Sequence, residues 1–320
     1  MEFGVSAPIR GPLANAANIR TLAAKAEALG YQYLTVSDHI VVPTEIGSTY
    51  PYSETGDFPW SEGGDVECME QFTLLSWLAA ITTKIRLLTS VTVVPHRSPL
   101  FMAKSLATID QLSGGRVTFG CGAGWMREEF EALGIPPFAA RGQVTNEYIE
   151  AIKTIWTQAR PVYNGEYVKF DKIGMDPKPV QTPHPPIWIG GESAPALRRT
   201  VAMGDTWYPF GTNPKFAMDT HAAYGARVEC LHGLAEAAGR DPASIGLAYN
   251  CAFHSAQAQT HRDGGRQICT GSPAQRAEDI RAFADLGTTS MVVNLVDNDL
   301  GAMLDRMEEF AANVVPLVNE

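Results

Sequence analysis

The sequence alternates eight times between a short run of aliphatic and β-branched residues and a longer segment whose apolar residues recur at helical spacing. The predicted strands are residues 2–7, 33–37, 85–94, 116–119, 186–189, 206–208, 245–253 and 290–295. The predicted helices are residues 15–29, 70–82, 99–113, 145–157, 194–203, 213–238, 272–286 and 299–310. Strands connected through helices pair in parallel. Eight such units predict an α/β fold, a (β/α)8 TIM barrel formed by residues 1–320 as a single domain. A doubly wound sheet is the alternative, but it needs fewer strands.

Residues 85–130 carry the clearest part of this pattern. Pro99 suits the first position of a helix, and Gly114 suits its end. In parallel α/β proteins, ligands bind at the carboxyl ends of the strands. Two such ends lie here, the polar interruption at residues 90–92 and the glycine run at residues 120–124, so we expect the functional site beside them.

Two insertions interrupt the alternation, one after the second strand and one before the fifth. The first, residues 43–67, is too long for an ordinary connection and predicts a lid over a substrate pocket. Its aromatic residues are Tyr50, Tyr52, Phe58 and Trp60. They suggest an apolar or aromatic substrate. The second, residues 161–186, is rich in proline and predicts a short hairpin around residues 166–170.

The composition limits the partners of the chain. A formal net charge of −10 argues against nucleic acid and against anionic membrane surfaces. The five cysteines are scattered without a Cys-x-x-Cys pair, which favours reduced thiols in the cytoplasm over disulfides or zinc. Neither a signal peptide nor a transmembrane run is expected. No His-Glu-x-x-His motif or compact His/Asp cluster is present, so we expect no metal site.

Asp38 and His39 follow the second predicted strand directly, on the catalytic face of a barrel. A histidine at that place donates a hydrogen bond to a cofactor or moves a proton near neutral pH. The alternative is that Asp38 is a turn residue and His39 a hydrogen-bonded side chain of the core.

The glycine-rich turns after the fourth and fifth strands let a backbone approach a ligand closely. The run at residues 120–124 is not a dinucleotide fingerprint, because its third glycine comes one residue early. Gly190, Gly191 and Ser193 precede a predicted helix and suit a phosphate, since backbone N–H groups at a helix start bind anions. The alternatives are a tight strand-to-helix turn in the first case and a helix N-cap at Ser193 in the second.

Residues 85–134, together with YLTVSDH at 33–39 and HPPIWIGGESAPALRRTVAMGDTWYPFG at 184–211, resemble the bacterial-luciferase-like superfamily of flavin or deazaflavin oxidoreductases. The resemblance extends over most of the chain. Within the superfamily it is greatest to the branch that uses coenzyme F420. The SDH after the second strand, the LSGGR before the fourth and the G-x-G-x-G-W loop suggest that branch.

The resemblance implies a TIM barrel with a bulge at the end of the third strand. It also implies a non-proline cis peptide at Ser90-Val91, behind the central ring of the cofactor. His39 would lie near the reactive edge of that ring, with Asp38 beside it. The cofactor-binding residues implied in this way are Ser90, Val91, Thr92, Gly122, Gly124, Trp125, Gly190, Gly191 and Ser193.

The function implied is an F420-dependent oxidoreductase that transfers a hydride between the deazaflavin and a small organic substrate, in a homodimer. The first alternative is an FMN-dependent monooxygenase that uses reduced flavin and oxygen. The second is a non-catalytic metabolite-binding barrel. F420-dependent sugar-phosphate dehydrogenases have a glutamate directly after the glycine loop, where this chain has Trp125, so sugar-phosphate chemistry is not expected. Glu128 and Glu129 are predicted to be solvated or packing residues of a helix.

Overall fold

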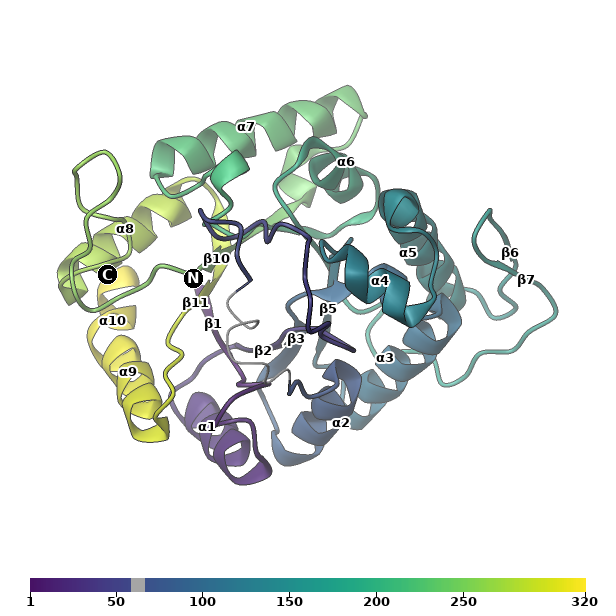
Figure 1. Cartoon of the computed structure of the whole chain (residues 1–320), viewed down its shortest axis with the longest axis horizontal. Helices are drawn as coiled ribbons and strands as arrows, with labels where there is room; N and C mark the ends of the chain where they lie inside the picture. The colour runs from purple at the N-terminus through teal and green to yellow at the C-terminus, as the bar shows by residue number, and fades with distance from the viewer. Residues whose placement is uncertain (59–66) are drawn as a thin grey trace.

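The computed structural model of the chain describes residues 1–58 and 67–320, and its strands form a closed parallel barrel surrounded by helices (Figure 1). The barrel strands are β1 (Glu2–Ser6), β2 (Tyr33–Val36), β3 (Arg86–Thr89), β4 (Thr92–Val93), β5 (Val117–Gly122), β8 (Ile187–Gly190), β9 (Thr206–Tyr208), β10 (Gly246–Cys251) and β11 (Thr288–Val293). Their order is β3-β2-β1-β11-β10-β9-β8-β5-β4, and pairing of β3 with β5 closes the circle. The predicted TIM barrel is confirmed.

The helices form the outer layer, as Figure 1 shows. They are α1 (Ala16–Ala28), α2 (Gln71–Ile81), α3 (Pro99–Ser113), α4 (Arg127–Leu133), α5 (Arg141–Thr157), α6 (Ala194–Met203), α7 (His221–Ala237), α8 (Pro273–Asp285), α9 (Leu300–Asn313) and α10 (Val315–Val318). Their buried faces and the outward side chains of the strands make the main hydrophobic core. The first and last barrel strands are neighbours, with Glu2 opposite Ser290 and Gly4 opposite Val292.

A second, smaller cluster of buried side chains fills the inside of the barrel. Its members are Tyr33, Leu88, Trp188, Tyr208, Ala248 and Val292. The Trp188 ring lies 5.0 Å from the Tyr33 ring and 5.3 Å from the Tyr208 ring, centre to centre. Because these rings plug the barrel, a ligand is restricted to its carboxyl end.

The third predicted strand is broken where the resemblance implied a bulge. The Ser90-Val91 peptide bond is cis and separates β3 from β4. This prediction is confirmed. The fourth predicted strand, residues 116–119, is longer than expected, since β5 continues to Gly122. A Cβ on Gly120 would lie 1.9 Å from the carbonyl oxygen of Thr89, so glycine is what allows the two strands to approach this closely.

Two helices differ from their predicted bounds. Helix α5 begins at Arg141 rather than at residue 145. The segment predicted as helical over residues 213–238 consists of a short 3-10 helix, Pro214–Phe216, followed by α7. The break comes at Thr220, whose hydroxyl accepts a hydrogen bond from Ala223 N and thereby starts a new helix.

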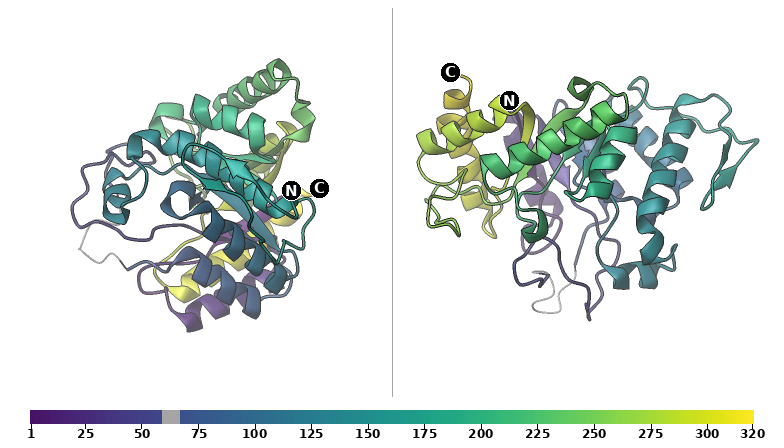
Figure 2. Two further views of the ribbon diagram at one scale, coloured as in Figure 1. Left: turned by 90° about the vertical axis from the view of Figure 1, so that its right-hand side faces the viewer. Right: turned by 90° about the horizontal axis from the view of Figure 1, so that it is seen from above.

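The two insertions extend from the barrel in different places. In the second, β6 (Tyr163–Asn164) pairs with β7 (Lys169–Phe170) in antiparallel fashion, which confirms the predicted hairpin. In the first, residues 43–58, here called the lid segment, lie at the end of the barrel away from both termini (Figure 2). The remainder of the predicted lid up to residue 66 is outside the described residues.

Candidate functional site

A cavity of about 650 Å³ opens at the carboxyl ends of the barrel strands. The expected site residues that line it are Asp38, His39, Ser90, Val91, Gly122, Gly124, Trp125, Gly190, Gly191 and Ser193. Thr92, expected among them, is not in the wall. It is buried, and its hydroxyl donates to Gln71 Oε1 over 2.7 Å, because the residue after the bulge returns to the outward side of the strand.

Glycines on two neighbouring strands make room for the bulge. A Cβ on Gly122 would lie 2.6 Å from Val91 Cγ2, and one on Gly190 would lie 3.1 Å from Val91 Cγ1. Both glycines also line the cavity. Glycine at these two positions therefore leaves space for the Val91 side chain. The expected contact of Gly122 and Gly190 with a cofactor tail stays a prediction.

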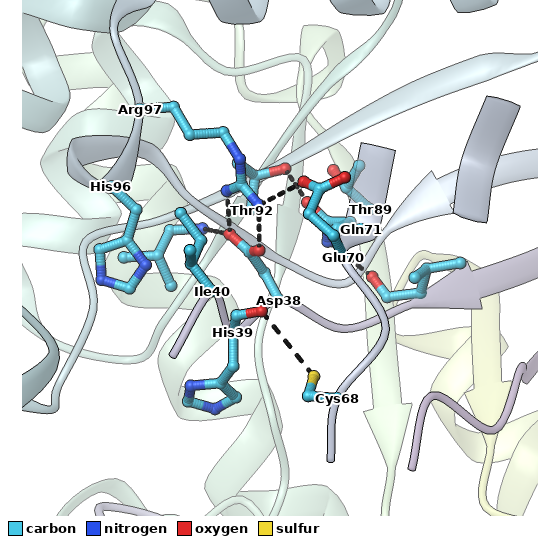
Figure 3. A network of polar contacts seen from close by, with 12 residues as sticks. Asp38, His39, Ile40, Cys68, Glu70, Gln71, Thr89, Thr92, His96 and Arg97 are labelled. Carbon is cyan, nitrogen blue, oxygen red and sulfur yellow. Dashed lines mark hydrogen bonds and ion pairs between the residues drawn. The ribbon is translucent and has the colours of Figure 1, made fainter. Parts of the chain in front are cut away.

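Asp38 is held by a network of buried polar groups (Figure 3). Arg97 donates to both carboxylate oxygens at 2.8 Å, and Val93 N donates to one of them at 2.9 Å. Burial acts to lower the pKa of Arg97, but the hydrogen bonds and charges of Asp38 and Glu70 outweigh it and raise that pKa. Asp38, expected to be catalytic, thus joins the segment after β2 to Val93 of β4 and to Arg97.

His39 points away from this network, as Figure 3 shows, and its Nδ1 lies 2.8 Å from Glu129 Oε2. The other oxygen of Glu129 accepts from Ile40 N at 2.8 Å and from Val41 N at 3.3 Å. The Glu129 side chain is 1% exposed. Its burial acts to raise its pKa, but the hydrogen bond from His39 and the charges of His39 and His96 lower it below its ordinary value.

An ionised carboxylate only accepts hydrogen bonds, so His39 Nδ1 is a donor in this pair. The nitrogen of His39 that can gain and lose a proton during a reaction is then Nε2. A histidine paired with a carboxylate in this way serves as a general acid or base.

The amino end of α6 borders the cavity. Ser193 is its N-cap residue, but the Ser193 side chain makes no capping hydrogen bond, and Gly191 before it has a φ of +106°. Arg141, from α5, also lines the cavity, and its Nε donates to Gly124 O over 3.1 Å. A helix start, glycine backbone and a guanidinium together suit an anionic group such as a phosphate.

Glu192 lies next to Gly191 and Ser193, but its carboxylate is bound by groups of another loop. Its carboxylate accepts from Phe210 N and from Asn213 Nδ2, each over 2.8 Å. Burial raises the pKa of Glu192, while those hydrogen bonds act in the opposite direction. It therefore stabilises the loop after β9.

The lid segment brings an aromatic cluster over the cavity. The rings of Tyr50, Phe58 and Trp125 lie 5.0–5.2 Å from one another, centre to centre. Tyr52 also lines the cavity, and Trp60 is outside the described residues. These contacts agree with the expected closure of the pocket by aromatic side chains.

The expectation that Glu128 and Glu129 are solvated or packing residues is wrong. Glu128 Oε1 accepts from Gly47 N and Ser48 N, each at 2.9 Å, and so ties α4 to the lid segment. Glu129 holds His39. A weak signal for burial of Glu129 was present in the sequence, because apolar Leu133 lies four residues later, on the same face of the helix.

The fold and the cavity are compatible with a flavin- or deazaflavin-dependent oxidoreductase of the TIM-barrel class. The chain belongs to the luciferase-like monooxygenase family, whose sequence model matches residues 1–260.

Relatives and solved structures agree with this assignment. A Mycobacterium tuberculosis protein described as uncharacterized is 31% identical over 263 residues, which cover 81% of this chain and 89% of the relative. The FMNH2-dependent dimethylsulfone monooxygenase of Pseudomonas putida is 29% identical over 293 residues, covering 78% of this chain and 79% of the relative.

The structure of an F420-dependent secondary alcohol dehydrogenase with an F420-acetone adduct matches with a TM-score of 0.76 at 17% identity, covering 100% of this chain and 99% of the other. The monooxygenase RslO1 of Streptomyces bottropensis matches with a TM-score of 0.74 at 21% identity, covering 99% of each chain. At these identities the two structures establish the fold alone. Solved structures of enzymes with F420 and with FMN share it.

In the part of the chain that the structure describes, no helix is long and apolar enough to cross a membrane. The cytoplasmic location, the homodimer and the lack of a metal stay predictions.

Proposed function

We propose that the chain is an F420-dependent oxidoreductase that transfers a hydride between the deazaflavin and a small organic substrate. The observation that carries the proposal is His39, which lines the same cavity as the Ser90-Val91 bulge and is paired with the buried Glu129 behind it. Hydride transfer to a polarised double bond leaves a negative charge, which a proton has to neutralise. The F420-like motifs around residues 37–39, 112–116 and 120–125 add support for the deazaflavin.

The residues of the cavity fit such a cofactor. The backbone at Ser90-Val91 offers a surface for one face of a planar ring, and Arg141 with the amino end of α6 suits an anionic tail. When bound, the deazaflavin supplies or accepts the hydride. The protein orients ring and substrate, and the aromatic lid cluster excludes water from the space between them.

In the reducing direction, His39 Nε2 gives its proton to the substrate atom next to the carbon that receives the hydride. Glu129 stabilises the protonated ring before transfer and keeps the proton on Nδ1 after it. In the oxidising direction, His39 Nε2 takes the proton.

A second candidate is an FMN-dependent monooxygenase. The similarity to the FMNH2-dependent dimethylsulfone monooxygenase over 78% of the chain favours it. In this reading the same cavity holds reduced flavin, and the cluster of Tyr50, Phe58 and Trp125 protects it from water.

Binding and turnover distinguish these candidates. The purified chain is titrated with F420 and with FMN, and reduced F420 is then mixed anaerobically with a panel of carbonyl and unsaturated compounds. We expect micromolar or tighter binding of F420, weaker binding of FMN, and oxidation of the deazaflavin by some of the panel. Equal or tighter binding of FMN with oxygen consumption would assign the monooxygenase. Metabolite binding without any redox change would assign the non-catalytic barrel.

The variant His39→Ala tests the proton step. We expect turnover to fall by roughly 10²-fold or more while F420 binding and the folded state persist. Normal turnover would make His39 structural.

A further inference from the structure

A chain of three polar side chains lies on the floor of the cavity. Tyr208, at the end of β9, places its hydroxyl 3.0 Å from Ser90 Oγ and 2.9 Å from Asn250 Nδ2. Tyr208 is 3% exposed, whereas Ser90 and Asn250 are half-buried and face the cavity. The chain therefore runs from β10 through β9 to the cis bulge.

The donor at Asn250 favours one direction for this chain. An amide nitrogen only donates, so Tyr208 Oη accepts from Asn250. Burial raises the pKa of the Tyr208 phenol, which keeps its single proton in place. At 3.0 Å either of the two hydroxyls can donate to the other. With Asn250 already donating to Tyr208 Oη, donation from Tyr208 to Ser90 Oγ completes the chain and leaves the Ser90 hydroxyl proton for another acceptor.

We infer that the Ser90 hydroxyl is a hydrogen-bond donor aimed into the cavity at a carbonyl-type acceptor of the bound ring, and that Tyr208 and Asn250 hold it in that direction. The inference rests on the proposed function for the presence of a ring. It makes Tyr208 and Asn250 positioning residues. It also explains why a serine, rather than an apolar residue, stands at a bulge otherwise packed by Val91 and glycines.

The variant Asn250→Asp reverses the chain with little change of shape. A carboxylate accepts from Tyr208, so Tyr208 turns its proton toward residue 250, and Ser90 then donates to Tyr208 instead of to the ligand. The added negative charge also weakens binding of an anionic cofactor by repulsion. Asn294→Asp is the matched control for that effect, because Asn294 lines the cavity on the neighbouring β11 side and donates to Ala252 O, not to Tyr208.

The experiment measures dissociation constants of F420 and of FMN, and the absorbance shift of each on binding, for the wild-type chain, Ser90→Ala, Asn250→Asp and the double variant. We expect Ser90→Ala to weaken binding of whichever of the two cofactors the wild-type chain binds more tightly, by about 3- to 10-fold. We expect Asn250→Asp to weaken it at least as much, but by a clearly smaller factor when Ser90 is already alanine. Asn294→Asp has the same effect in both backgrounds.

Thermal unfolding confirms that each variant is folded, and Ser90→Thr, which keeps a hydroxyl, is expected to retain most of the affinity. Equal effects of Asn250→Asp with and without the Ser90 hydroxyl would overturn the inference. Preference for FMN, with the coupling intact, would overturn the proposed cofactor and leave the inference standing, since both rings carry carbonyl acceptors. Binding of neither cofactor would overturn both.

Discussion

The contact between His39 and Glu129 determines which ring nitrogen of His39 carries the proton in the neutral state. Glu129 presents a carboxylate oxygen 2.8 Å from Nδ1 and is itself held by the backbone N–H groups of Ile40 and Val41. In the variant Glu129→Gln, the amide oxygen can keep those backbone donors. The amide NH2 group then faces Nδ1, which has to accept, so the proton moves to Nε2.

The size of the effect follows from the kind of hydrogen bond that is lost. A hydrogen bond to a charged group contributes about 1.5–3 kcal/mol, which corresponds to roughly a 10- to 150-fold preference for the tautomer with the proton on Nδ1. With the amide in place, this preference is reversed. Because Nε2 then carries a proton in the neutral state, His39 can no longer accept one there, and we expect turnover to fall about 10²-fold or more in the direction that needs a base.

Selective 15N labelling of the seven histidines and long-range proton–nitrogen NMR spectra report the tautomer directly, without a substrate. The His39 signals are assigned by their loss in His39→Asn. The matched control is Glu131→Gln, a change of the same kind at an exposed position of the same helix, which should leave the His39 spectrum unchanged. A wild-type spectrum with the neutral proton on Nε2, or identical spectra for wild type and Glu129→Gln, would refute the reasoning.

Three further predictions concern stability. Replacing Arg97 by Met leaves a buried carboxylate unpaired and should lower the free energy of unfolding by about 3–5 kcal/mol in urea titrations; a loss below about 1 kcal/mol would contradict the assigned ion pair. Gly120→Ala should destabilise the fold, because the added Cβ meets a carbonyl oxygen at 1.9 Å, whereas Gly233→Ala has open space within α7 and should stabilise it by about 0.5–1 kcal/mol; effects of the same sign would be inconsistent with the close strand approach. Burial, followed by the charge of Arg276, lowers the pKa of His254 to about 4, so the unfolded chain binds this proton first as the pH falls. The free energy of unfolding should therefore drop by about 3 kcal/mol between pH 6.5 and 4, and His254→Gln should flatten that slope.

The sequence was sufficient for the barrel because the information is local and repeated. Each strand is a short buried run and each helix has a recognisable start or end, so errors stay at the boundaries, as with the start of α5. The cis bond at Ser90-Val91 was predicted only through the family resemblance. The packing of Gly122 and Gly190 against the Val91 side chain was not predicted, because no sequence pattern shows which side chain faces a glycine.

The site was predicted less completely, since its polar partners come from distant segments. Asp38 and His39 line the cavity as expected, but Asp38 meets Arg97 and His39 meets Glu129 only after the barrel has closed. A charged residue on a helix is normally solvated, and nothing near Glu129 in the sequence specifies a histidine 90 positions earlier.

The pairing of β1 with β11 also affects how the chain folds during synthesis. Among the barrel strands β1 comes earliest in chain order and one of its two neighbours, β11, comes latest, so Glu2 cannot pair with Ser290 until β11 has been made. Until β11 has left the ribosome, β1 and β10 each keep an open edge of unpaired backbone groups, the kind of edge that recruits other chains. Pairing of β11 with β1 and β10 therefore closes the barrel. Until then the open strand edges have to be kept from pairing with other chains, because the cavity forms only in the closed barrel.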